Sequence, residues 1–210
     1  MKLYHGTSSS YLKKILREGL KPRGKRKGNW GPMASIPEAV YLTNAYAIHF
    51  ARCCAVGRGR YCIVEIDVEK ADFWNFIPDE DFLEQALRDN PEYAPFMRET
   101  LEERTAWCRE AVQDRFSHIW EVSLESLGNC AHLGPIAPEA ITKIALIKHD
   151  HPLSLNCDPT ITLMNYKIMG PWYRNSMRHL FGNSDFEADP INDVERLRAI
   201  SREGIEVIEP

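Results

Sequence analysis

Leu3-Tyr-His-Gly-Thr-Ser8 lies at the start of the chain and indicates the order of its first elements. It joins a predicted strand, Lys2–His5, to a run of three serines that can cap a helix. Apolar residues then recur at helical spacing at Leu12, Ile15, Leu16 and Leu20. Gly19 is suited to end that helix. The sequence therefore begins with a strand, a tight turn and a short helix.

The alternation of strand and helix continues outward from this start. Ala39–Thr43 is the second predicted strand, and Asn44 is the expected cap of an apolar, buried helix over residues 45–56. Residues 61–68 are rich in β-branched side chains, which indicates a central strand. Residues 21–37 are rich in Gly, Pro, Lys and Arg and are predicted to form a loop.

The second half of the chain is predicted to add a helical insertion and further strands. The insertion covers about residues 72–116, with one helix beginning near Pro78-Asp-Glu-Asp81. Strands are expected at residues 118–124, 130–133, 144–147 and 161–168, and short helices at residues 172–181 and 194–200. The short connections favour antiparallel pairing, so the sequence predicts an α+β fold with a split sheet, mixed or antiparallel. A single domain is expected over residues 1–182, followed by a C-terminal tail at 183–210.

The composition limits the classes of function. The formal net charge is −4, which does not favour binding of nucleic acid by the whole surface. Residues 21–27 are the local exception, with positive charges at Lys21, Arg23, Lys25, Arg26 and Lys27. The six cysteines contain no C-x-x-C pair, which predicts reduced thiols and no metal site.

The sequence also predicts the compartment of the cell in which the protein is found. No stretch is long and apolar enough to cross a membrane. Met1–His5 lacks the apolar core of a signal peptide, so a cytoplasmic protein is predicted.

Several segments in a fixed order carry a resemblance to a known family. They are Leu3–Ser8, Ile15-Leu-Arg-Glu-Gly-Leu-Lys-Pro22, the basic loop, Val40-Tyr-Leu-Thr-Asn-Ala45 with His49-Phe-Ala51, and Gly134-Pro-Ile-Ala-Pro-Glu-Ala-Ile141. This succession resembles the ADP-ribosyltransferase superfamily, and most of all its branch of diphtheria-type toxins and poly-ADP-ribose polymerases. The resemblance covers roughly residues 2–67 and 118–148.

The resemblance implies an NAD⁺-dependent mono-ADP-ribosyltransferase. Such an enzyme breaks the nicotinamide–ribose bond of NAD⁺ and passes ADP-ribose to a macromolecular acceptor, here a nucleic acid or a protein. A role as a bacterial or phage toxin or defence effector, with an antitoxin as a further partner, rests on the same resemblance. Two alternatives stay open. One is an NAD⁺-dependent RNA 2′-phosphotransferase, and the other is a non-catalytic module that binds NAD⁺ or ADP-ribose.

The first strand supplies the expected contacts to NAD⁺. A glycine at a strand end lets a ligand approach the backbone, whose N–H and C=O groups can pair with a planar amide. By resemblance, His5 is expected to hydrogen-bond the ribose and Gly6 to pair with the nicotinamide carboxamide. Thr7 or Ser8 is expected to hold the adenosine side.

Aromatic and basic residues complete the expected NAD⁺ site. Tyr41 is expected to stack on the nicotinamide ring, with Tyr11 or Tyr46 as a second aromatic wall. Arg23 in the basic loop is expected beside the NAD⁺ pyrophosphate or a nucleic-acid backbone, and a solvated loop is the alternative. Gly170-Pro-Trp-Tyr-Arg174 either packs against the sheet or closes over the acceptor site.

The reaction also needs a carboxylate, because cleavage of the C1′–N bond leaves an oxocarbenium-like ribose. In the family this is usually a glutamate at the start of the strand before the Gly-Pro-Ile segment. Here that place holds Asn129, Cys130 or Ala131, and none of them is acidic. The catalytic candidates are therefore Glu125, His132 or an acid of the insertion, namely Asp79, Glu80, Asp81 or Glu84. Because the expected acid is missing, a protein that binds NAD⁺ without cleaving it stays as an alternative.

Overall fold

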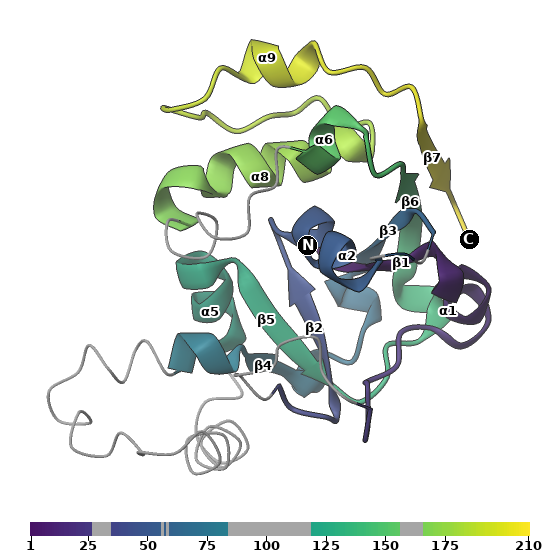
Figure 1. Cartoon of the computed structure of the whole chain (residues 1–210). Coiled ribbons are helices and arrows are strands. Elements are labelled where there is room, and N and C mark those ends of the chain that lie inside the picture. Colours follow the sequence, from purple (N-terminus) through teal and green to yellow (C-terminus); the bar gives the residue numbers. More distant parts are fainter. Residues whose placement is uncertain (27–34, 56, 58, 84–118, 156–165) are drawn as a thin grey trace, which may run out of the picture.

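The computed structural model describes residues 1–26, 35–55, 57, 59–83, 119–155 and 166–210. Within these residues, seven strands form one sheet in the order β4-β5-β2-β1-β3-β6-β7 (Figure 1). The strands are β1 (Lys2–Ser8), β2 (Ala39–Thr43), β3 (Tyr61–Asp67), β4 (Phe76–Pro78), β5 (Asn129–Leu133), β6 (Ile141–Ile147) and β7 (Ile205–Ile208). All six neighbouring pairs are antiparallel. The predicted α+β class is confirmed.

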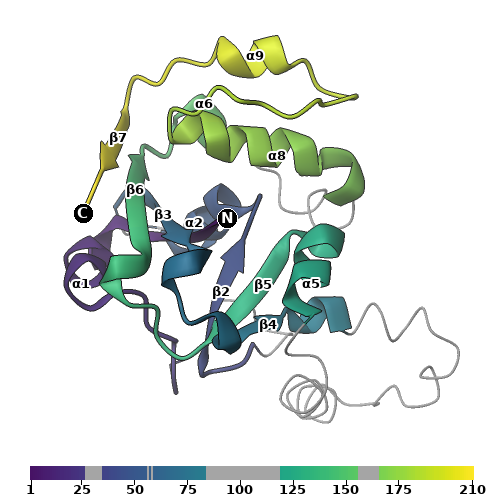
Figure 2. The ribbon, with the colours of Figure 1, turned by 180° about the vertical axis from the view of Figure 1, so that it is seen from behind.

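Helices cover both faces of this sheet. They are α1 (Leu12–Glu18), α2 (Ala47–Cys54), α5 (Trp120–Leu127), α6 (Pro152–Leu155), α8 (Tyr166–Leu180) and α9 (Val194–Arg198). Alternate residues of β3 face opposite sides: Ile63 packs in one core cluster with α2 and α8, and Val64 in another with α1 and α5. The view from behind shows α9 outside α8, and β7 beside β6 at the edge far from β4 (Figure 2).

The sheet is nearly divided between β1 and β2. These strands share a single residue pair, Tyr4↔Thr43, whereas β1 pairs with β3 along its whole length, from Lys2↔Asp67 to Ser8↔Tyr61. One half of the sheet is therefore β4-β5-β2, and the other is β1-β3-β6-β7. The single pair leaves the β2-facing edge of β1 without a strand partner beyond Tyr4, as far as the described residues show.

The start of the chain folds as predicted, with one exception. Gly19 ends α1 at φ 72°, and its N–H donates to the Ile15 carbonyl at 2.9 Å. Asn44 is not the cap of α2, which was the prediction. Tyr46 occupies the N-cap position and makes no side-chain cap hydrogen bond. Thr43 Oγ1 accepts hydrogen bonds from the N–H groups of Ala45 and Tyr46, before the helix, at 3.0 and 2.9 Å. The side chain of Asn44 accepts from the Tyr166 hydroxyl.

Two predicted strands are wrong where the structure describes them. Residues 120–127 form α5, because Trp120, Ser123 and Leu124 lie on one buried side at helical spacing and Gly128 ends the helix at φ 75°. Residues 166–168 belong to α8, and residues 161–165 lie outside the described part. Both segments are rich in apolar residues, and such a composition is compatible with a strand or with a helix.

The predicted helical insertion is partly wrong. Residues 76–78 form β4, which pairs with β5, and a single turn of 3₁₀ helix at Phe73–Asn75 precedes it. Helical residues begin at Glu80 as expected, and residues 84–116 lie outside the described part. A strand of three residues is too short to give a pattern in the sequence.

The segment predicted as a tail contains regular structure. The expected helix at residues 194–200 is present as α9, and Leu197 on it is fully buried. Strand β7, which the sequence analysis did not predict, pairs with β6 and forms the edge of the sheet. No helix among the described residues combines the length and apolar character needed to cross a membrane.

Candidate functional site

His5 bridges the gap between β1 and β2. Its ring is half-buried, and Nδ1 lies 2.9 Å from the carbonyl oxygen of Tyr41. A carbonyl only accepts, so Nδ1 carries the proton and Nε2 is left as the acceptor of the ring. Burial lowers the pKa of His5, which keeps the imidazole neutral at pH 7. The side chain is therefore held in one tautomer at the point where the two half-sheets separate.

Gly6 has a packing role that the sequence analysis did not foresee. A Cβ at this position would lie 2.0 Å from the carbonyl oxygen of Ala47 and 2.5 Å from the backbone N of Ala51. Helix α2 therefore fills the space where a side chain would be. Thr7 follows on β1 and is buried, and Ser8 Oγ accepts from Ser10 N at 3.3 Å and caps the turn before α1.

The side chain of Tyr41 packs against a different core cluster from those of its neighbours on β2. It packs with Ile77 and Ala131, whereas its neighbours Val40 and Leu42 face the other core cluster. The hydrogen bond of His5 is to the backbone carbonyl of Tyr41.

The Tyr41 hydroxyl is held at its far end by two polar partners. It donates to the Glu80 carboxylate. The N–H of Ile36 lies 2.7 Å from both the Tyr41 hydroxyl oxygen and Glu80 Oε1. Glu80, Tyr41 and the end of the basic loop thus form one hydrogen-bonded group.

Asp79 directly follows β4 and precedes Glu80 of this group. Asp79 is buried, and its Oδ1 accepts from Asp81 N at 2.9 Å. Its backbone N–H donates to Ser123 Oγ at 3.1 Å. Burial raises the pKa of Asp79 well above the ordinary value and also raises the pKa of Glu80. Of the insertion acids named from the sequence, Glu80 is the one in contact with Tyr41, and Glu84 lies outside the described residues.

Asn129 begins β5, where the family resemblance places the glutamate. It pairs with Thr43, which in turn pairs with Tyr4 at the junction of the half-sheets. The residue is 4% exposed, and its Oδ1 has no hydrogen-bond partner among the described residues. A buried amide oxygen without a partner is uncommon and costs free energy. The start of β5 therefore holds a polar but uncharged acceptor.

The other catalytic candidates lie in ordinary structural settings. Glu125 is exposed on α5, where a strand was predicted. His132 is 1% exposed, with Nε2 at 3.2 Å from the carbonyl oxygen of Asp72 and its ring edge-on to Phe76. Burial lowers the pKa of His132, so it is a neutral, hydrogen-bonded residue within the sheet.

Arg23 holds the described ends of the basic loop together. Its guanidinium donates to the Ser35 carbonyl at 2.6 Å, to Ser35 Oγ at 3.2 Å and to the Arg26 carbonyl at 2.5 Å. These acceptors are neutral, so they do not cancel its charge. Residues 27–34, including Lys27 at the end of the predicted basic run, lie outside the described part.

The remaining aromatic candidates are divided between core and surface. Tyr46 is buried and lies edge-on to the rings of Tyr166 and Tyr173. Tyr11 is 37% exposed just before α1. Of Gly170–Arg174, Trp172 and Tyr173 pack in the core, which is the first of the two expected roles of that segment.

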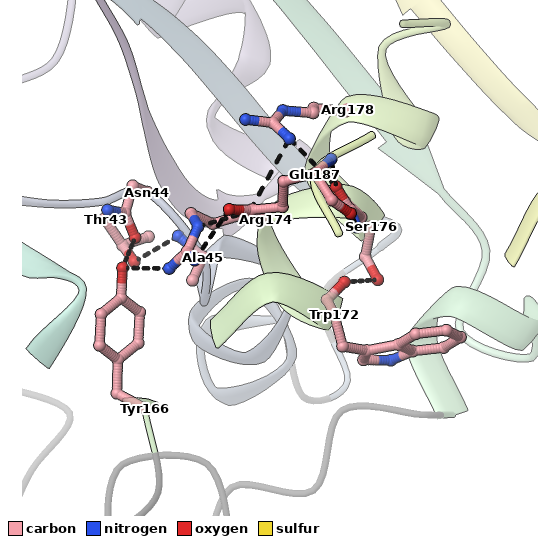
Figure 3. Close-up of polar contacts among 10 residues, drawn as sticks. Thr43, Asn44, Ala45, Tyr166, Trp172, Arg174, Ser176, Arg178 and Glu187 are labelled. Atoms are coloured by element: carbon pink, nitrogen blue, oxygen red, sulfur yellow. Dashed lines mark hydrogen bonds and ion pairs between the residues drawn. The ribbon is translucent and has the colours of Figure 1, made fainter. Parts of the chain in front are cut away.

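Arg174 connects α8 to the chain beyond it (Figure 3). Its Nε and Nη2 donate to the two carboxylate oxygens of Glu187 at 2.6 and 3.0 Å. Its Nη1 donates to the Tyr166 hydroxyl at 2.6 Å, and that hydroxyl donates to Asn44 Oδ1 at 2.9 Å. A continuous polar path therefore joins the end of β2 to the C-terminal segment.

No protein-family model matches the chain, and no curated protein matches it. A solved structure described as EcPltA is similar, with a TM-score of 0.40 and 14% identity over 73% of this chain and 79% of that chain. This is at most a distant likeness of fold, and it carries no argument about activity.

Proposed function

We propose that this protein binds NAD⁺ along the open edge of β1 and transfers ADP-ribose to a macromolecular acceptor. The single residue pair between β1 and β2 supports this most directly. Beyond Tyr4, backbone groups on the β2-facing edge of β1 have no strand partner in the described part, and His5 and Gly6 lie there. An unpaired strand edge offers N–H and C=O groups that suit the carboxamide of nicotinamide.

The state of His5 fits contact with the ribose. With Nδ1–H donated to the Tyr41 carbonyl, Nε2 can accept a hydrogen bond from a ribose hydroxyl. A neutral ring also avoids repulsion with the positively charged nicotinamide ring of NAD⁺.

Glu80 is the best supported carboxylate for the reaction. When the C1′–N bond breaks, its electron pair leaves with nicotinamide, and the ribose gains positive charge that a carboxylate stabilises. The acceptor then attacks C1′, and its proton needs a base. A carboxyl group with a raised pKa is a stronger base than an ordinary one, and Glu80 has this property. Its link to Tyr41 connects it to the strand whose backbone holds His5.

One observation favours a second candidate function, a non-catalytic module that binds NAD⁺ or ADP-ribose. Asn129 stands where the resemblance places the catalytic glutamate. An amide can accept a hydrogen bond from a ribose hydroxyl, but it neither takes up a proton nor carries negative charge.

Release of free nicotinamide from NAD⁺ by the purified protein tests the proposal. We expect release by the natural protein, a loss of at least tenfold in His5→Ala, and a similar loss in Glu80→Gln. Glu125→Gln is the matched control, because it removes an exposed carboxylate on α5, and its rate should stay within twofold.

The other outcomes separate the alternatives. Binding of NAD⁺ by calorimetry without release identifies the module. Transfer of phosphate from a 2′-phosphorylated RNA to NAD⁺ identifies the phosphotransferase. A natural protein that neither binds nor cleaves NAD⁺ rules out the proposal.

A further inference from the structure

Helix α1 and the loop that follows it form a strongly basic surface, here named the basic face. It consists of Lys13, Lys14, Arg17, Lys21, Arg23, Lys25 and Arg26. Arg23 is half-buried and the other six are exposed. Glu18 is the one acidic residue in this stretch, although the whole chain has a net charge of −4. The positive charge of the protein is therefore concentrated here.

Two of these cations, Arg17 and Lys21, lie close together around one carboxylate. Lys13 and Arg17 are one helical turn apart and share a side of α1. Glu18 contacts both Arg17 and Lys21, the latter at 2.7 Å, and these hydrogen bonds lower the pKa of Glu18 to about 2. The Glu18 carboxylate is therefore shared between Arg17 and Lys21. Lys13 and Lys14 have no ion pair within the described residues, so most of the positive charge faces solvent uncompensated.

An exposed aromatic residue immediately precedes α1 in the chain. Tyr11 ends the 3₁₀ turn Ser9–Tyr11 directly before α1, is 37% exposed, and precedes Lys14 by three positions. A flat ring next to cations is the arrangement that binds single-stranded nucleic acid: the base stacks on the ring and the phosphates meet the cations. A duplex, whose bases are already stacked, gains only the phosphate contacts.

We propose that the basic face binds single-stranded nucleic acid through its phosphates, with Tyr11 stacking on a base. The 3₁₀ turn Ser9–Tyr11 connects β1 to α1, so a nucleic acid strand that stacks on Tyr11 lies three residues from the end of β1 along the chain. If the proposed function is correct, this strand is the acceptor of ADP-ribose. The binding itself does not depend on that function.

Fluorescence anisotropy with a labelled oligonucleotide of about 20 nucleotides measures the binding. The DNA and RNA single strands and the matching duplex are compared at several salt concentrations. Because each phosphate contact adds about 0.7 to the slope of log affinity against log salt, Lys13→Glu with Lys14→Glu should lower the slope by about 1.4. The affinity should fall at least tenfold. Tyr11→Ala should weaken single-strand binding about fivefold or more, while the slope stays unchanged.

Lys148→Glu with Lys167→Glu is the matched control. Both lysines are exposed, Lys148 after β6 and Lys167 on α8, and the change in net charge is the same. Affinity in this variant should stay within twofold of the natural protein. Equal weakening by both double variants would show that only net charge matters, which overturns the proposal. Equal thermal melting of both double variants and the natural protein checks that the fold is kept.

Two further outcomes contradict the proposal, and one assay keeps it separate from the enzyme reaction. Absence of oligonucleotide binding at low salt overturns it. Binding to vesicles with 30% phosphatidylserine but not to oligonucleotides identifies a lipid surface instead. Release of nicotinamide without an acceptor should be unchanged in Lys13→Glu with Lys14→Glu. If the natural protein releases no nicotinamide but binds the oligonucleotide, the proposed function is wrong. The proposal that the basic face binds nucleic acid is then still supported.

Discussion

Burial controls the charge of the carboxyl groups at the end of β4. One carboxyl oxygen of Asp79 accepts a hydrogen bond from the N–H of Asp81, and the side chain is otherwise buried from water. Removing a carboxylate from water disfavours its charged form, and the neighbouring Asp81 and Glu80 add repulsion. The folded protein therefore holds a proton on Asp79 at a pH where the unfolded chain releases it.

This proton predicts how stability changes with pH. A carboxyl group whose pKa is raised on folding stabilises the protein at low pH, and that contribution is lost as pH rises above the ordinary carboxyl range near 4. Asp79→Asn keeps the acceptor oxygen and cannot ionise. We expect the free energy of unfolding of the natural protein, relative to Asp79→Asn, to fall steadily as pH increases. Urea unfolding from pH 4 to pH 8 measures it.

Asp150→Asn is the control for this measurement, because it removes one carboxylate from an exposed position after β6. If the difference in free energy of unfolding between the natural protein and Asp79→Asn does not change with pH, Asp79 does not hold a proton in the folded protein.

At the scale of elements, the contact between β1 and α2 positions the candidate site. Gly6 lets the helix backbone approach the strand, and Ala47 and Ala51 on α2 are fully buried. Small residues on both sides allow this approach. His5 precedes Gly6 on β1, and its Nδ1 lies 2.9 Å from the Tyr41 carbonyl oxygen.

Gly6→Ala tests this contact. The added methyl group meets backbone atoms of α2, which cannot rotate away, so the strand or helix must shift. We expect a loss of about 2–4 kcal/mol in the free energy of unfolding. Gly24→Ala is the control, since its Cβ meets nothing within 4 Å and its φ of 60° costs only about 1 kcal/mol. Equal losses in the two variants would contradict the packing role of Gly6.

The elements also show where sequence patterns were sufficient. Residues 39–43 and 61–67 are β-branched or aromatic runs with clear ends, and both strands are confirmed. Residues 120–127 mix Trp, Val and Leu with charges, a pattern that suits strand or helix. Packing of Trp120 against Phe76, at a ring distance of 4.8 Å, is consistent with the helix. That contact joins residues 44 positions apart, which no local pattern reveals.

At the scale of the whole molecule, the C-terminal segment closes one edge of the sheet. Strand β7 covers β6, Leu197 of α9 is buried in the core, and Glu187 pairs with Arg174. An edge strand deprived of its neighbour exposes unpaired backbone groups that bind other chains. The segment that follows residue 182 is therefore expected to support the fold.

A shortened protein ending at Gly182 tests this expectation. We expect a loss of several kcal/mol in the free energy of unfolding, since the buried Leu197 alone accounts for about 2–5 kcal/mol. We also expect oligomers or aggregates in size-exclusion chromatography. A protein lacking only residues 209–210 is the control, because it keeps β7. A monomeric short form with unchanged stability would show that the segment is a dispensable tail.

Local patterns in the sequence were sufficient to predict the α+β class, strands β1, β2 and β3, the end of α1 at Gly19, and the run of positive charge after β1. These features depend on local periodicity, glycine conformation and composition. The addition of β4 and β7 to the sheet, and the contact of Glu80 with Tyr41, became known from the folded structure. The folded structure also leaves the amide oxygen of Asn129 buried without a partner in the described part. Such features arise from contacts between distant segments, whose free energy depends on how the chain packs and not on any run of neighbouring residues.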